Sequence, residues 1–225
     1  MLMAVFCLGA SLIGINAQEK DWANLQRYAQ QNAELPKPDK NEMRVVFMGN
    51  SITEGWVNTH PDFFKSNGYI GRGIGGQTSY QFLVRFREDV INLSPALVVI
   101  NAATNDIAEN TGAYHEDRTF GNIVSMVELA KANHIKVILT TTLPAAAFGW
   151  NPAIKDAPQK IQSLNARIEA YAKANKIPFV NYYQPMVVGE NKALNPQYTK
   201  DGVHPTSEGY DIMEPLIKNA IEKAL

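Results

Sequence analysis

The chain has 225 residues, of which 45% are hydrophobic and 19% charged, values typical of a soluble globular protein with one core. Its formal net charge is −1, so it has no basic field to attract nucleic acid or an anionic membrane, and we expect no nucleic-acid partner. The only cysteine is Cys7, which excludes a disulfide framework. A mature chain that lacks it would also have no thiolate nucleophile and no cysteine-based metal site.

The first 17 residues form an uncharged apolar run that ends in Ala17, ahead of the polar residues 18–21. The run is short for a bilayer span and is typical of the apolar region of a secretory signal peptide cut after Ala17. The basic segment that usually precedes such a region is missing, so a buried N-terminal strand or helix is the alternative. Cys7 also lacks the setting of a lipoprotein box. Cleavage would leave residues 18–225 as a single domain without a membrane span, in the bacterial periplasm or outside the cell.

Short apolar runs alternate with segments of helical periodicity along the rest of the chain. Apolar, partly β-branched runs predict strands at 45–48, from 69, and at 95–100, 135–142 and 178–182. Apolar residues at helical spacing predict helices at 21–35, 79–92, 119–133, 157–175 and 207–224, with a mixed helix and loop segment at 52–64. Strands that alternate with helices indicate repeated βαβ units. The sequence therefore predicts an α/β protein, a three-layer α/β/α sandwich with a parallel sheet of about five strands.

Polar loops follow the first three predicted strands. Ser51 comes directly after the first, the pair Gly75-Gly76 follows the second, and Asn105 follows the third. Because the carboxyl ends of parallel strands meet at one edge of a sheet, we expect the three loops to lie together. A serine there can meet a substrate, and the amides of its turn can stabilise negative charge. Each loop taken alone could equally be an ordinary turn, which Gly, Asn and Ser all favour.

A further polar pattern, Asp201-Gly202-Val203-His204, precedes the last predicted helix. An acid three residues before a histidine can place its carboxylate against the imidazole Nδ1 and leave Nε2 outward as a base. The pattern alone would more often be a helix N-cap beside a surface histidine. In this chain it supplies the base that an exposed serine at a strand end needs.

These segments resemble, in order, the four blocks of the SGNH or GDSL-type hydrolase family. They are Gly49-Asn50-Ser51-Ile52, Gly75-Gly76-Gln77-Thr78, Thr104-Asn105-Asp106 and Asp201-Gly202-Val203-His204. The resemblance implies a flavodoxin-like fold and a triad of Ser51 as nucleophile, His204 as base and Asp201 as its orienting acid. It also implies an oxyanion hole made by the amides of Ser51 and Gly76 and the side chain of Asn105. No metal and no organic cofactor is implied.

Three positions depart from the family pattern. Asn50 stands where the family name has Asp, and Gly71 stands where an Asn often begins the second block. Ala103 replaces the usual Gly two residues before Asn105. A methyl group at 103 could crowd the loop, and reduce activity, if the backbone there needs a positive φ.

Other side chains are candidates for substrate contacts. Trp56 and Trp150 lie in segments that could border the site and stack on sugar rings, although packing in the core is at least as good an explanation. Arg72 could contact a substrate carboxylate, with a structural ion pair as the alternative. The remaining histidines sit in polar or loop surroundings and are expected at the surface; they are His60, His115 and His134.

The sequence therefore predicts an exported serine esterase that removes short acyl groups, with acetyl groups on carbohydrate as the first candidate substrate. Lipase, thioesterase or platelet-activating-factor-acetylhydrolase-like activity is an alternative within the same class, although no long apolar lid segment for an acyl chain is evident. A non-catalytic carbohydrate-binding or scaffold protein that keeps the fold is the alternative from another class. The sequence does not determine the oligomeric state.

Overall fold

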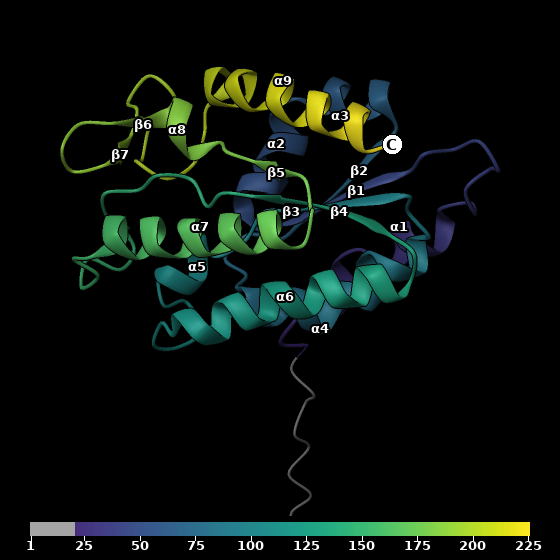
Figure 1. Ribbon diagram of the computed structural model, residues 1–225, viewed down its shortest axis with the longest axis horizontal. Helices are drawn as coiled ribbons and strands as arrows, with labels where there is room; N and C mark the ends of the chain where they lie inside the picture. Colours follow the sequence, from purple (N-terminus) through teal and green to yellow (C-terminus); the bar gives the residue numbers. More distant parts are fainter. Residues whose placement is uncertain (1–20) are drawn as a thin grey trace, which may run out of the picture.

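The computed structural model describes residues 21–225, so Cys7 and the expected signal peptide lie outside the described residues. A parallel sheet of five strands forms the centre, in the order β2-β1-β3-β4-β5. Its strands are β1 (Val45–Gly49), β2 (Tyr69–Gly73), β3 (Leu97–Ile100), β4 (Lys136–Thr140) and β5 (Phe179–Val180). Helices cover both faces of this sheet (Figure 1), which confirms the predicted three-layer α/β/α fold.

Alternating side chains of the central strands build two cores, one on each face of the sheet. Val46 and Met48 of β1 face one core, which also contains α4 (Ser79–Asp89), α6 (Glu116–Ala132) and α7 (Ala157–Ala174). Val45 and Phe47 face the other, together with α2 (Ser51–Thr59), α3 (Pro61–Asn67) and α9 (Ser207–Ala224). These four side chains are buried, as a strand covered by helices on both sides requires.

The strand order sets where a ligand can bind. From β1 the chain passes first to β2 on one side and then to β3 on the other, so the order reverses between β1 and β3. In open α/β sheets the crevice at such a switch point, beyond the carboxyl ends of the strands, is the usual ligand site. The loops that carry Ser51 and Asn105 leave the sheet at this point.

The N-terminal segment differs from its prediction. In place of one helix over 21–35, the chain forms a 3₁₀ turn, η1 (Leu25–Arg27), and a short helix, α1 (Ala29–Glu34). Asn24 adopts the left-handed conformation and Tyr28 breaks the helical geometry between the two. The apolar residues counted as one helical face therefore belong to separate turns.

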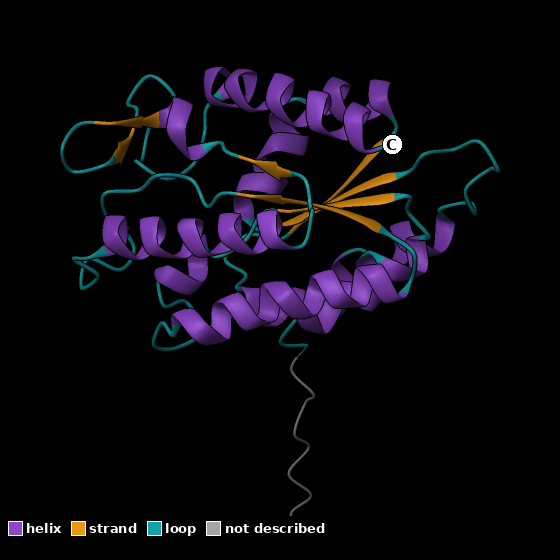
Figure 2. Cartoon of the chain, in the orientation of Figure 1, coloured by secondary structure: helices purple, strands orange, loops and turns teal. Residues whose placement is uncertain are grey.

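The last strand is also shorter than predicted. The expected strand at 178–182 ends at Val180, because the backbone amides of Tyr182 and Tyr183 donate to the Thr141 hydroxyl at 2.9 and 3.0 Å. Several small elements were not predicted at all. They are η2 (Ile91–Leu93), α5 (Thr104–Ile107), α8 (Tyr183–Met186), and the strands β6 (Val187–Val188) and β7 (Ala193–Leu194), which form a hairpin apart from the main sheet (Figure 2). Within residues 21–225, no helix combines the length and the apolar character that crossing a membrane would require.

The segment predicted as mixed helix and loop consists of two helices. Helix α2 ends and α3 begins at His60, and Pro61 occupies the first turn of α3. The start of α2 packs closely on β2, because a Cβ added to Gly73 would lie 2.2 Å from the backbone nitrogen of Glu54. Only a residue without a side chain fits between this strand and the helix that begins with Ser51.

We expect Gly73→Ala to destabilise the fold by about 1–3 kcal/mol or more, because the obstructing atoms belong to the backbone and cannot rotate away. The matched control is Gly121→Ala in α6, where an added Cβ meets nothing within 4 Å and should raise stability by about 0.5–1 kcal/mol. Urea unfolding of both variants measures the difference. Equal stability of the two variants would contradict the close packing of β2 on α2.

Candidate active site

Ser51 is presented at the start of a helix directly beyond the end of β1. Asn50 caps α2, and its Oδ1 accepts a hydrogen bond from the backbone nitrogen of Ile52 at 3.0 Å. Ser51 is the first residue of that helix, where backbone N–H groups lack intrahelical partners and the helix dipole favours negative charge. The half-buried side chain therefore stands in a setting suited to an anionic reaction intermediate.

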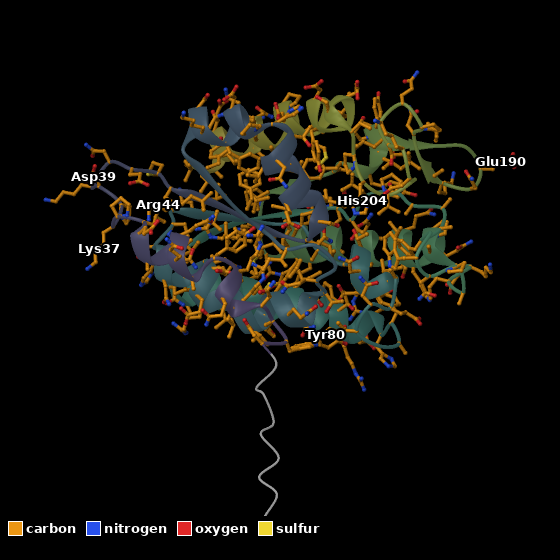
Figure 3. All side chains as sticks on the ribbon, turned by 180° about the vertical axis from the view of Figure 1, so that it is seen from behind. Lys37, Asp39, Arg44, Tyr80, Glu190 and His204 are labelled. Carbon is orange, nitrogen blue, oxygen red and sulfur yellow. The ribbon has the colours of Figure 1, made fainter. Side chains whose placement is uncertain are left out.

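A histidine and an aspartate from the far end of the sequence complete a relay with this serine. The Ser51 Oγ lies 2.8 Å from the Nε2 of His204, and the Nδ1 of His204 lies 2.7 Å from the Oδ2 of Asp201. Figure 3 shows Arg44, just before β1, on one side of the molecule and His204 towards the other, as expected for a site at the carboxyl edge of the sheet. The three side chains predicted from the amino-acid sequence are thus linked by two consecutive hydrogen bonds. This arrangement can withdraw a proton from the serine.

The loop before α9 fixes the orientation of Asp201. Its burial would raise the pKa of the carboxyl, but hydrogen bonds from the backbone and ring of His204 and from the backbone of Val203 outweigh it and lower the pKa to about 2. The backbone nitrogens of His204 and Val203 lie 2.8 and 2.9 Å from Oδ1, which leaves Oδ2 for the imidazole. The Thr199 hydroxyl lies 3.2 Å from the same Oδ1. Asp201 is therefore a carboxylate at neutral pH and holds the proton on Nδ1 of His204.

The loop after β2 lies beside Ser51 and is held from two directions. The Glu54 carboxylate accepts the N–H of Gly75 at 2.8 Å, and the Asn110 side chain donates to the carbonyl of Gly76 at 3.0 Å. Gly76 itself has a φ of +76°, in the left-handed region that favours glycine. Within residues 21–225, the N–H of Gly76 has no hydrogen-bond acceptor, so it is available to a ligand.

Asn105 is anchored to the same loop. Its Nδ2 donates to the carbonyl of Gln77 at 2.9 Å, which uses one of the two amide hydrogens. The neighbouring Asp106 accepts from the backbone of Ser79 at 2.9 Å and from the hydroxyl of Thr119 at 3.2 Å. Burial raises the pKa of Asp106, while these hydrogen bonds act against that rise. The polar contacts join the second and third loops into one unit.

Ala103, which replaces the usual glycine of the third block, adopts the positive φ at which a methyl group was expected to crowd the loop. Ala103 has a φ of +85° and is 1% exposed, so its methyl group is buried in a left-handed backbone. This conformation costs an L-residue about 1–2 kcal/mol relative to glycine. The chain nevertheless places α5, and with it Asn105, directly after this turn.

The three candidate substrate contacts lie in different places. Trp150 is 47% exposed, and its ring centroid lies 6.1 Å from that of His204. Trp56 is 2% exposed and stacks on Tyr210 in the core, which matches the core alternative and not a substrate contact. Arg72 is also buried, and its guanidinium donates to the side chain of Asn32 at 2.7 Å, an arrangement that is neither a substrate contact nor an ion pair.

Several polar residues that hold the site were not singled out from the sequence. Glu54 lies one helical turn after Ser51, and this spacing is the one local signal that could have indicated it. Asn110 links two loops, because its Oδ1 accepts from the indole nitrogen of Trp150 at 2.9 Å while its Nδ2 binds Gly76.

His60, expected at the surface, has a side chain that is only 15% exposed and is hydrogen-bonded on both ring nitrogens, so that expectation was wrong.

Comparison with known proteins assigns the chain to a class of enzymes. The sequence pattern of the GDSL-like lipase/acylhydrolase family matches residues 47–212, and the chain belongs to this family. This confirms the predicted family, and with it the predicted class of enzyme.

Two crystal structures of Bacteroides proteins are very similar. A GDSL-like lipase from Bacteroides thetaiotaomicron has 84% sequence identity and a TM-score of 0.90, over 90% of this chain and 99% of that chain. A Bacteroides fragilis protein assigned as an acylhydrolase has 91% identity and a TM-score of 0.91, over 91% of this chain and 99% of that chain. Both likenesses extend over the described domain.

More distant matches have lower sequence identity. An acetyl xylan esterase has 21% identity and a TM-score of 0.63, over 79% of this chain and 98% of that chain, which is a likeness of fold alone. An uncharacterized lipoprotein of Bacillus subtilis is 32% identical over 117 residues, 44% of this chain and 48% of the relative. The chain thus matches about half the length of this curated relative.

We expect Asp201→Asn to lower kcat/KM for ester substrates by about 10³–10⁴-fold with little change in folding. The two backbone N–H groups on Oδ1 require an oxygen there, so the new amide nitrogen faces Nδ1 of His204 and forces the proton onto Nε2. Asp156→Asn, at the exposed start of α7, is the matched control and should keep normal kinetics. A loss below about tenfold in Asp201→Asn would contradict the orienting role.

Proposed function

We propose that this protein is an exported serine esterase that removes short acyl groups through an acyl-enzyme. The observation that carries the proposal is the continuous relay from the Ser51 Oγ to the Nε2 of His204 at 2.8 Å and from its Nδ1 to Asp201 at 2.7 Å. Membership of an acylhydrolase family supports the reaction class. In this proposal Ser51 is the nucleophile, His204 the general base and Asp201 the residue that orients it.

The chemistry follows from the order of the relay. His204 accepts the hydroxyl proton as the Ser51 oxygen attacks the ester carbonyl, and the Asp201 carboxylate stabilises the imidazolium that forms. His204 then gives this proton to the leaving alcohol. Water, activated by the same imidazole, hydrolyses the acyl-serine and restores the enzyme. The family resemblance implies no metal or organic cofactor for these steps.

In this proposal, three groups stabilise the tetrahedral oxyanion. The N–H of Ser51 stands at the start of α2, and the N–H of Gly76 is left without an acceptor within residues 21–225. The third is the amide hydrogen of Asn105 that Gln77 does not use. The loss of one such donor typically costs about 3 kcal/mol of transition-state stabilisation. Glu54 and Asn110 contribute indirectly, because they hold the loop that carries Gly76.

The half-exposed ring of Trp150 favours carbohydrate as the alcohol part of the substrate. The Trp150 ring stands beside His204, packs on Phe148 at a centroid distance of 5.3 Å and is fixed through its indole nitrogen by Asn110. A rigid, half-exposed indole offers a flat apolar face to a sugar ring while its polar edge stays bonded. The fold is shared with an acetyl xylan esterase, which supports acetyl as the acyl group to test first.

The proposed export rests on the apolar run that ends at Ala17 and on the curated relative, which is itself a lipoprotein. Export would place the mature domain, residues 18–225, in the periplasm or outside the cell.

The first test of this function is hydrolysis of p-nitrophenyl acetate, butyrate and octanoate by the wild type and by Ser51→Ala. We expect turnover that declines with acyl chain length and falls by about 10³-fold or more in Ser51→Ala. Intact-mass analysis with an organophosphonate should show an adduct on Ser51. A wild type that neither turns over esters nor labels Ser51 would overturn the esterase and favour a non-catalytic carbohydrate-binding protein.

The second test concerns Trp150. We expect Trp150→Ala to raise KM for acetylated xylo-oligosaccharides about tenfold, because a stacking contact of about 1–1.5 kcal/mol is lost. Turnover of p-nitrophenyl acetate should change far less, since its small leaving group does not need the contact with Trp150. Trp150→Phe, which keeps an aromatic face without the bond to Asn110, should lie between the two. Equal KM values for the sugar ester in wild type and Trp150→Ala would contradict the binding of a sugar ring by Trp150.

A further inference from the structure

A second serine, histidine and carboxylate form a relay outside the proposed site. The Oγ of Ser207 lies 2.7 Å from the Nε2 of His60, and the Nδ1 of His60 lies 2.6 Å from the Oε1 of Glu214. The two distances nearly equal those of Ser51, His204 and Asp201, and the same ring nitrogens face the serine and the acid.

The imidazole of His60 is held in one orientation. Its backbone joins α2 to α3, and its ring packs against the edge of Tyr210 at a centroid distance of 5.8 Å. Glu214 also accepts from the indole nitrogen of Trp56 at 3.1 Å, so its carboxylate is fixed independently of the histidine. Asp211 lies 4.0 Å from the same Nδ1 and adds negative charge. Two carboxylates near Nδ1 favour the tautomer with the proton there, which leaves the Nε2 lone pair for the Ser207 hydroxyl.

The serine of this second relay is accessible. Ser207 is exposed and is the first residue of the 18-residue helix α9, whose first-turn N–H groups lack intrahelical acceptors. It borders a surface hollow of about 500 Å³ that is also lined by Asp201 and His204, with Lys200 as a positive and Glu208 as a further negative charge. An ester carbonyl in this hollow could therefore reach the Ser207 oxygen near a helix N-terminus, which favours a developing oxyanion.

We propose that Ser207 is a second nucleophile, which becomes acylated by activated esters with His60 as its general base and Glu214 as a positioning residue. The Ser207 oxygen forms a bond to the carbonyl carbon while its proton passes to the Nε2 of His60. The carbon–oxygen bond to the alcohol breaks, the alkoxide or phenoxide leaves, and the imidazolium returns its proton to the leaving group or to solvent. The product is an acyl-serine on α9. This step does not depend on Ser51.

The test uses Ser51→Ala, which removes the proposed primary nucleophile. The protein is incubated with p-nitrophenyl acetate, digested and analysed by mass spectrometry. We expect acetyl-Ser207 at an occupancy at least about tenfold above that of Ser163, an exposed serine on α7 without a histidine partner. Adding His60→Gln to Ser51→Ala should lower the acetyl occupancy of Ser207 by about tenfold. Adding Glu214→Gln instead should lower that occupancy by a smaller factor.

Each outcome decides the proposal. Acetylation of Ser207 no greater than that of Ser163 in Ser51→Ala would overturn it, whatever the fate of the His60 variants. Acetylation that survives His60→Gln in a protein with unchanged circular dichroism would overturn the role of the histidine. In the wild-type background the organophosphonate reports on Ser51 by a separate adduct, so failure at Ser207 is distinguishable from failure of the proposed esterase at Ser51.

Discussion

The site depends on one buried cation, the guanidinium of Arg85. This side chain is 0% exposed and donates to the carbonyl of Gly49, the side chain of Gln77 and the carboxylate of Asp89, at 2.9, 2.6 and 2.8 Å. Desolvation lowers the pKa of Arg85, while the bond to Asp89 acts in the opposite direction. One group thus ties the end of β1 to the loop after β2. Because an unpaired buried charge costs several kcal/mol, the two strand ends are held in a fixed relation.

Close backbone packing adds a second constraint on the same region. Gly73 lets β2 approach the first turn of α2, and Glu54 from that turn reaches across to the N–H of Gly75. The serine and the loop beside it are consequently positioned both by close main-chain packing and by hydrogen bonds from buried or anchored side chains. Ala103, in a left-handed conformation, shows that the third loop keeps its course even where the favoured glycine is absent.

Both relays are built on the same pair of helices, α2 and α9. The start of α2 supplies Ser51 to a histidine in the loop before α9, whereas the end of α2 supplies His60 to a serine at the start of α9. Trp56 and Tyr210, stacked at a centroid distance of 5.4 Å, form the apolar contact between these helices. Packing of one helix pair therefore contributes to the geometry of two polar arrangements, and the loop that carries Gly76 lies beside Ser51 in the first of them.

The alternating α/β architecture, the family and the residues of the proposed triad could all be predicted from the amino-acid sequence, because buried strands and short polar blocks are local patterns. The sequence did not determine the break at Asn24, the early end of β5, or the burial of Trp56 and Arg72, which depend on neighbours distant in the chain. The relay of His60, Ser207 and Glu214 was likewise invisible, since its members lie up to 154 residues apart and match no block. These features emerge with the packed fold, because a hydrogen bond between distant segments forms only when helices and strands have come together.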